Sequence, residues 1–156
     1  MRHRYLFILE IDPVEVGRAY EELPSHLTLM SRFFSDLPSA KITESVLPLF
    51  KSKNLVEVKF GQTTKLGPKK LTVHMVSNTD HLKGLHNDLK HLLDSLHVEY
   101  EYPQFIGEGH KPHVTWRNGN NFHAGDNRIA SAAYLIEVVD KKRVVRSKLS
   151  LKGNDL

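Results

Sequence analysis

The alternation of apolar and polar residues along the chain predicts a mixture of strands and helices. Residues 4–11 are rich in aromatic and branched side chains and are typical of a buried strand, and residues 26–34 begin with the polar/apolar alternation of a second strand. Leucines recur at helical spacing over residues 80–96 and form one stripe, which predicts a helix packed against a core. The other predicted elements are a short helix at 13–23 capped by Asp12, a helix at about 40–52, strands at 55–60, 71–76, 97–102 and 113–117, and a hairpin of 129–139 and 143–151.

This order of elements predicts an α+β fold with an antiparallel sheet and helices packed outside it. Gly67 and Pro68 mark a turn between two of the strands. Each half of the chain places a helix before a strand that carries a His-x-Thr triplet, which gives the sequence a rough two-fold rhythm. The chain has 156 residues and no linker or low-complexity segment, so we expect a single domain over residues 1–156.

The composition narrows the chemistry that is open to the chain. Because it has no cysteine, disulfides, thiolate metal sites, iron–sulfur clusters and cysteine nucleophiles are excluded. The apolar run at residues 5–9 is too short for a signal peptide and no stretch is long enough to cross a membrane, so we expect a soluble, cytoplasmic protein. The net charge of +4 favours anionic partners, although the basic C-terminal segment equally fits an exposed hairpin.

The two His-x-Thr triplets are the strongest candidates for a functional site. Residues two apart on a strand point to the same face, so His26 and Thr28 share one face while Leu27 points into the core. His113 and Thr115 share a face in the same way. Each triplet thus presents an imidazole and a hydroxyl on a strand that is held by buried neighbours.

A pair of such triplets suits phosphodiester chemistry. One neutral imidazole can take the proton of the attacking hydroxyl or water, and one imidazolium can give a proton to the leaving oxygen. The two threonine hydroxyls can bind the non-bridging phosphate oxygens. Further candidate substrate contacts are three cations near the triplets in sequence, Lys111, Arg117 and Arg32, and two aromatic residues before the glycine-containing loop at 106–112, Phe105 and Tyr102.

The ten histidines do not predict a metal site. His81, His86 and His91 are five residues apart, so successive side chains lie about 140° around a helix and cannot converge on one ion. His110 and His113, three apart near a strand, point to opposite faces. We therefore expect neither a metal nor another cofactor.

At this point the sequence resembles a known family. SHLTLM at residues 25–30 and HKPHVTW at 110–116 are similar to the two signature motifs of the two-histidine phosphoesterase superfamily, the 2′-5′ RNA ligase-like proteins, and the resemblance covers essentially the whole chain. It implies a bilobal α+β fold of antiparallel sheets with outer helices, a pseudo-two-fold axis and an active-site cleft between the lobes.

The same resemblance implies roles for the motif residues. His26 and His113 would be the acid and the base, and Thr28 and Thr115 would bind phosphate. Members act without metal on 2′,3′-cyclic phosphates, 2′-5′ linkages or cyclic nucleotides, and some rejoin RNA halves through a 2′-5′ bond.

Two other hypotheses remain open beside this metal-independent phosphodiesterase. The chain could be a non-catalytic module that holds nucleotide or RNA in the same cleft, or an unrelated α+β domain whose triplets arose by chance. For the phosphodiesterase and for the binding module we expect a monomer with RNA or a nucleotide as its partner. Which histidine is the base is left open, because it depends on the polarity of the substrate.

Overall fold

The computed structural model describes residues 2–66, 71–115 and 123–152. Within these ranges its helices are α1 (Ser39–Lys51), α2 (Asp80–Ser95) and two short 3-10 helices, η1 (Pro103–Phe105) and η2 (Gly107–Gly109). The strands are β1 (His3–Glu10), β2 (Ala19–Tyr20), β3 (His26–Ser35), β4 (Val56–Leu66), β5 (Leu71–Val76), β6 (Glu99–Tyr100), β7 (His113–Thr115), β8 (Asn127–Ala130), β9 (Ala132–Val139) and β10 (Lys142–Ser150).

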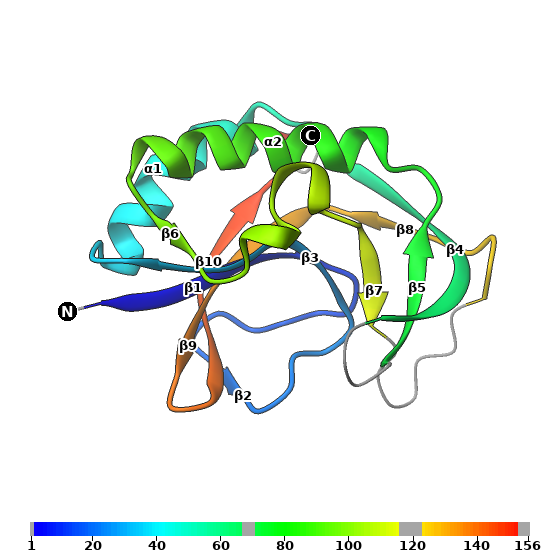
Figure 1. The fold of residues 1–156 in the computed structure, drawn as a ribbon, viewed down its shortest axis with the longest axis horizontal. Helices are drawn as coiled ribbons and strands as arrows, with labels where there is room; N and C mark the ends of the chain where they lie inside the picture. The colour runs from blue at the N-terminus through cyan, green and yellow to red at the C-terminus, as the bar shows by residue number, and fades with distance from the viewer. Residues whose placement is uncertain (1, 67–70, 116–122, 153–156) are drawn as a thin grey trace.

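All of these strands belong to one antiparallel sheet, and the two long helices lie together over it (Figure 1). The strand order is β2-β10-β9-β1-β3-β7-β5-β4-β8, with β6 beside β3. The two strands that carry the His-x-Thr triplets, β3 and β7, are therefore neighbours in the middle of the sheet. The predicted α+β class with an antiparallel sheet and helices outside it is confirmed.

Both long helices form because their apolar residues make one stripe that packs on the sheet. In α1 the buried side chains are Ile42, Val46 and Phe50, spaced four residues apart. In α2 the leucines of the predicted stripe face the core: Leu82, Leu85, Leu89 and Leu93 are buried, and Leu92 and Leu96 are partly buried against it. In the described part of the chain, no helix combines the length and the apolar composition needed to cross a membrane.

The sheet is buried on both faces around β1. On the helix side Phe7 and Leu9 join the main core, together with Leu27 of β3. On the other side Ile8 belongs to a second cluster that is covered by the segment between β1 and β3. This two-sided burial explains why residues 5–9 form a continuous apolar run rather than an alternating one.

The helix predicted at 13–23 is wrong. Gly17 has φ +92°, outside the right-handed helical region, and its backbone N–H donates to the carbonyl of Val145 at 2.7 Å. Ala19 and Tyr20 pair as the edge strand β2 with β10. Pairing of this edge strand with β10 and burial of side chains in the second cluster outweigh the local capping signal. Val16, an apolar residue within the segment, is 55% exposed.

Smaller differences concern the lengths of elements. The strand predicted at 97–102 is only β6, because His97 adopts a left-handed φ of 58° that ends α2. Residues 55–60 begin the longer β4, and the first strand of the C-terminal hairpin is divided into β8 and β9. The predicted turn at Gly67 and Pro68 lies outside the described residues.

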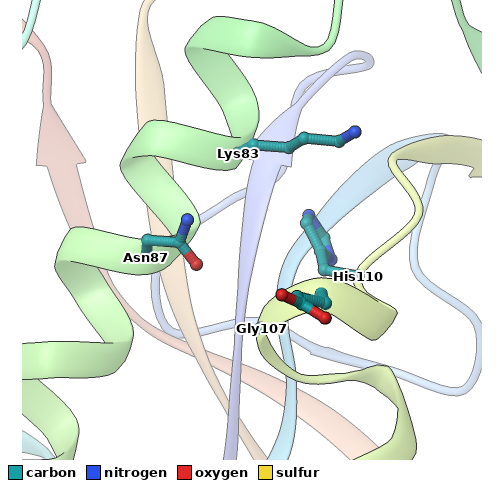
Figure 2. Close-up of a pocket in the computed structure, with 5 residues that line it drawn as sticks. Lys83, Asn87, Gly107 and His110 are labelled. Carbon is teal, nitrogen blue, oxygen red and sulfur yellow. The ribbon is translucent and has the colours of Figure 1, made fainter.

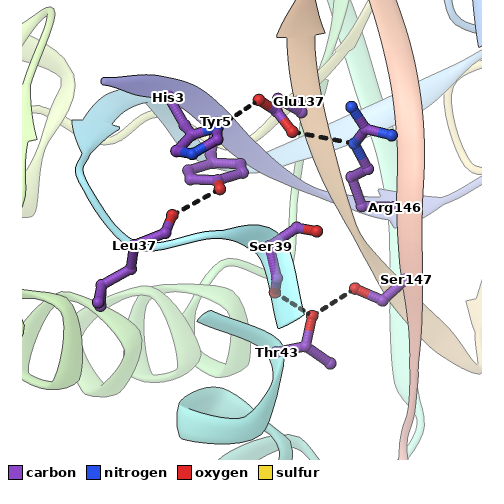
Figure 3. A network of polar contacts seen from close by, with 8 residues as sticks. All are labelled: His3, Tyr5, Leu37, Ser39, Thr43, Glu137, Arg146 and Ser147. Atoms are coloured by element: carbon purple, nitrogen blue, oxygen red, sulfur yellow. Dashed lines mark hydrogen bonds and ion pairs between the residues drawn. The ribbon is translucent and has the colours of Figure 1, made fainter. Parts of the chain in front are cut away.

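A polar network fastens the ends of three strands to each other (Figure 3). Glu137 of β9 accepts from His3 Nδ1 of β1 at 2.8 Å and from Arg146 Nε of β10 at 2.9 Å. Nearby, the hydroxyl of Tyr5 donates to the carbonyl of Leu37 at 2.7 Å. Burial, and after it the charge of Glu137, raises the pKa of Tyr5, so this phenol stays a neutral donor.

Candidate functional site

The pairing of β3 with β7 brings the two His-x-Thr triplets side by side. Leu27 lies directly opposite Val114 in the antiparallel register. One residue to either side, the register places Thr28 opposite His113 and His26 opposite Thr115. Two segments that are far apart in the sequence thus form a single constellation of four residue positions in the middle of the sheet.

The constellation lies on the face of the sheet that the long helices leave uncovered. Leu27 and Val114 are fully buried in the main core beneath those helices. Because side chains alternate along a strand, His26, Thr28 and His113 point to the opposite face. Directly opposed positions have Cβ atoms about 5 Å apart and diagonal positions about 7–8 Å apart, which is the separation expected for the two histidines.

A local two-fold axis runs through the Leu27–Val114 pair. Every directly opposed pair of an antiparallel ladder lies on such an axis. This one carries the position of His26 onto that of His113, and the position of Thr28 onto that of Thr115.

The two catalytic candidates make the same hydrogen bond to their own backbone. His26 Nδ1 lies 2.8 Å from the carbonyl oxygen of Pro24, and His113 Nδ1 lies 2.7 Å from that of Lys111. A carbonyl oxygen only accepts, so Nδ1 carries the proton in both rings. In its neutral form each imidazole therefore holds its lone pair on Nε2, the nitrogen that can exchange a proton with a substrate.

A carboxylate that sequence reasoning missed lies beside one of the histidines. Glu10 of β1 is directly opposite His26 in the register. Its Oε2 accepts the hydroxyl of Tyr134 at 3.2 Å. Burial, and after it the charge of Glu10, raises the pKa of Tyr134 to about 12, so the phenol remains a donor to this carboxylate. The only sequence signal was that Glu10 directly follows the apolar run of residues 5–9.

Three of the other predicted substrate contacts lie together. Arg32 Nη2 donates to the hydroxyl of Tyr102 at 3.1 Å, and the Tyr102 ring lies 6.0 Å from that of Phe105, which is 51% exposed. Arg32 also pairs with Glu101 at 3.3 Å. Lys111 is exposed near His113, and its backbone carbonyl accepts the Nδ1–H of that histidine. Arg117 lies outside the described residues.

A second pair of histidines, on the helix side of the sheet, forms a contact that the sequence did not predict. His86 of α2 and His110 stack with ring centroids 3.9 Å apart and planes 4° apart. The loop that carries His110 is folded into η1 and η2, and the backbone of Gly109 packs so closely on the carbonyl of Gln104 that no side chain would fit there. A cavity of about 270 Å³ next to His110 is lined by Lys83, Asn87, Gly107 and Glu108 (Figure 2).

The His86–His110 pair predicts a fall in stability with acid. His110 is 8% exposed, and burial, reinforced by the neighbouring His86, lowers its pKa to about 3. The unfolded chain binds a proton at this residue below about pH 6.5 while the folded chain does not, so stability is lost as the pH falls from there toward 3. Urea unfolding at a series of pH values should show up to about 1.4 kcal/mol lost per pH unit from this group.

His110→Phe is the matched variant for this prediction, because it keeps a ring that can stack on His86 and removes the titrating group. Its free energy of unfolding should fall less steeply with acid than that of the wild-type chain. Parallel curves for the two proteins would contradict the prediction.

In residues 2–66, 71–115 and 123–152, no three His, Cys, Asp or Glu side chains come together as a metal site would require. The expectation that the reaction needs no metal remains a prediction about activity.

Comparison with known families identifies the family of this fold and motif pair. The family model described as the 2′-5′ RNA ligase superfamily matches residues 7–141, which include both triplets. The chain belongs to the 2′-5′ RNA ligase superfamily, the two-histidine phosphoesterases. A search of curated proteins found no match.

Solved structures share the fold over nearly the whole chain. A crystal structure of a phosphoesterase matches with a TM-score of 0.63 and 14% identity, over 97% of this chain and 99% of the other. Escherichia coli LigT complexed with 3′-AMP matches with a TM-score of 0.61 and 14% identity, over 97% and 99%. The protein TT0787 of Thermus thermophilus matches with a TM-score of 0.58 and 17% identity, over 96% and 98%. At these identities the likeness shows a LigT-like fold.

Proposed function

We propose that this chain is a metal-independent phosphodiesterase that acts on RNA 2′,3′-cyclic phosphates, 2′-5′ linkages or related cyclic nucleotides. The observation that carries the proposal is the register of β3 and β7, which puts two imidazoles with the same Nδ1–carbonyl bond on one face around a local two-fold axis. Acid–base catalysis needs this arrangement, with one imidazole on each side of the reacting phosphorus.

In the proposed hydrolysis of a 2′,3′-cyclic phosphate, the Nε2 of one neutral histidine takes a proton from water as the oxygen attacks phosphorus. The other histidine, protonated, gives its proton to the ribose oxygen as the P–O bond breaks. The product is a ribose monophosphate with one free hydroxyl. Thr28 and Thr115 would hydrogen-bond the non-bridging oxygens, where negative charge accumulates.

The larger architecture implied by the family belongs to the same proposal. Between β3 and β7 the strand order divides into β2-β10-β9-β1-β3 and β7-β5-β4-β8, and in each half the motif strand is innermost. We infer two lobes related by a pseudo-two-fold axis, with the substrate in a cleft over the pairing of β3 with β7. The single domain over 1–156, the monomeric state and the cytoplasmic location remain predictions.

A nucleotide or RNA partner is supported by one structural neighbour. LigT of E. coli has been crystallised with 3′-AMP, with ATP and with NADP+. In the present chain, exposed Phe105 and the adjacent Tyr102 would offer ring surfaces for a base, and Arg32, Lys111 and Arg117 would offer positive charge to the phosphates. The reverse reaction, joining RNA ends through a 2′-5′ bond, would use the same groups.

The alternative function is a binding module that holds a nucleotide without turnover. A histidine at the equivalent position of both triplets, each with its Nδ1 bonded to a carbonyl, favours the enzyme, because a binder needs no matched acid and base.

Turnover in a chelator separates these two functions. The purified chain would be incubated with 2′,3′-cyclic nucleotides and with 2′-5′ dinucleotides in EDTA, and the products separated by chromatography. We expect hydrolysis of at least one class. A folded protein that binds these nucleotides without cleaving any of them would support the binding module instead.

A further inference from the structure

His86 of α2 is bonded through both ring nitrogens to the two segments that carry the motifs. Its Nδ1 lies 2.7 Å from the carbonyl oxygen of Leu29, and its Nε2 accepts the backbone N–H of Gly107 at 2.9 Å. The first bond requires a proton on Nδ1 and the second a lone pair on Nε2, so the ring is a neutral imidazole in one tautomer. It is 1% exposed, and burial lowers its pKa, which agrees with that form.

The two hydrogen-bond partners of His86, Leu29 and Gly107, lie near the two motifs along the sequence. Leu29 directly follows Thr28 on β3. Gly107 begins η2, from which the chain passes through His110, stacked on the same ring, to Lys111 and His113. The carbonyl of Lys111 accepts a hydrogen bond from the Nδ1–H of His113, so a displacement of this loop would also disturb that bond.

The direct backbone pairing between the two motif strands, β3 and β7, is short. Within the described residues, β3 and β7 share the single register pair of Leu27 and Val114, whereas β3 pairs with β1 along nearly its whole length. The separation of the two triplets therefore depends on contacts made from the helix side of the sheet. His86 of α2 makes two such contacts, and both are directional hydrogen bonds. A leucine there would continue the apolar stripe but leave the Leu29 carbonyl and the Gly107 N–H without this partner.

We propose that His86 is a positioning residue for the two-histidine site: by bridging β3 and the loop before β7, it sets the placement of His113 relative to His26 without touching the substrate. This inference rests on the proposed function. It explains why an otherwise apolar stripe of α2 contains one fully buried histidine.

Three variants separate the two bonds. His86→Asn can keep an N–H near the Nδ1 position for Leu29 but loses the acceptor for Gly107. His86→Gln can keep an acceptor near the Nε2 position for Gly107 but loses the donor to Leu29. His86→Leu loses both hydrogen bonds. His91→Asn, exposed on the same helix, is the matched control. For each protein the measurements are the melting temperature, kcat and KM for the substrate that the wild-type chain cleaves, the pH profile of kcat, and the imidazole NMR signals of His113 and His26.

We expect kcat to fall about 10- to 100-fold in His86→Leu with little change in KM, because a small misplacement of a catalytic group has effects of this size. The pH profile should shift and the His113 signals should move, whereas His91→Asn should match the wild-type chain. Folded His86→Leu and His86→Asn with wild-type kcat, pH profile and His113 signals would refute the positioning role. A loss of activity matched by an equal loss of folded protein would refute it as well.

The NMR signals keep this test separate from that of the proposed function. If the wild-type chain cleaves none of the substrates, the phosphodiesterase proposal fails. The His113 signals of the His86 variants, with and without inorganic phosphate, still report whether His86 positions that ring.

Discussion

Replacing His113 with alanine is expected to lower kcat for the cleaved phosphodiester by about 10²- to 10⁴-fold, and His26→Ala should have an effect of the same order. Each change removes a group proposed to move a proton in the transition state. The fold should be retained, because both side chains lie on the helix-free face and neither belongs to a core cluster. Steady-state kinetics in EDTA, with circular dichroism to check folding, would measure the effect.

Two variants serve as controls for this prediction. Thr28→Ala should lower kcat less, by about 10- to 100-fold, because it removes one hydrogen bond to a charged oxygen. His81→Ala, on the exposed side of α2, should leave the rate unchanged. Near-wild-type activity of either motif-histidine variant would remove that histidine from the mechanism.

The largest loss of stability is expected from Phe7→Ala, which should lower the free energy of unfolding by about 3–5 kcal/mol. Phe7 is 0% exposed on β1, and its ring lies 5.8 Å from that of Phe33 and 6.0 Å from that of Phe50 in α1. The substitution would leave a cavity where the sheet meets the helix. A domain of this size has a stability of about 5–15 kcal/mol, so the loss would be a large part of the total.

The matched control is Phe105→Ala, which truncates the same side chain at a position that is half exposed. Its stability in urea should stay within about 0.5 kcal/mol of the wild-type value. If Phe105 stacks on a base as proposed, the same variant should raise KM. Equal losses of stability in the two variants would show that the core is not organised around Phe7.

The sequence predicted best those features that depend on local pattern. The leucine stripe of α2 and the continuous apolar run of β1 identified their elements, because burial imposes a regular spacing. The His-x-Thr triplets were found for a similar reason, since alternation on a strand makes imidazole and hydroxyl share a face. The short helix at 13–23 was wrong because its capping signal was local, whereas the pairing of Ala19 and Tyr20 with β10 joins distant parts of the chain.

The same distinction explains what the sequence left out of the site. That β3 and β7 pair in the register of Leu27 and Val114 is a non-local fact, and no local pattern contains it. Glu10 enters the site only through the register of β1 with β3. His86 carried a weak signal, since it lies among the leucines of the α2 stripe, but its two hydrogen bonds are made to distant backbone groups.

The axis through Leu27 and Val114 has a consequence for directionality. A phosphodiester turned end for end would meet the same four motif positions, with the proton donor and the proton acceptor exchanged. The motifs alone therefore cannot tell the attacking side of a substrate from the leaving side. The strands outside them can, because His26 is flanked by the carboxylate of Glu10 and His113 by the thioether of Met75. In a working enzyme, these flanking residues would decide which histidine acts as the base for a substrate of a given polarity.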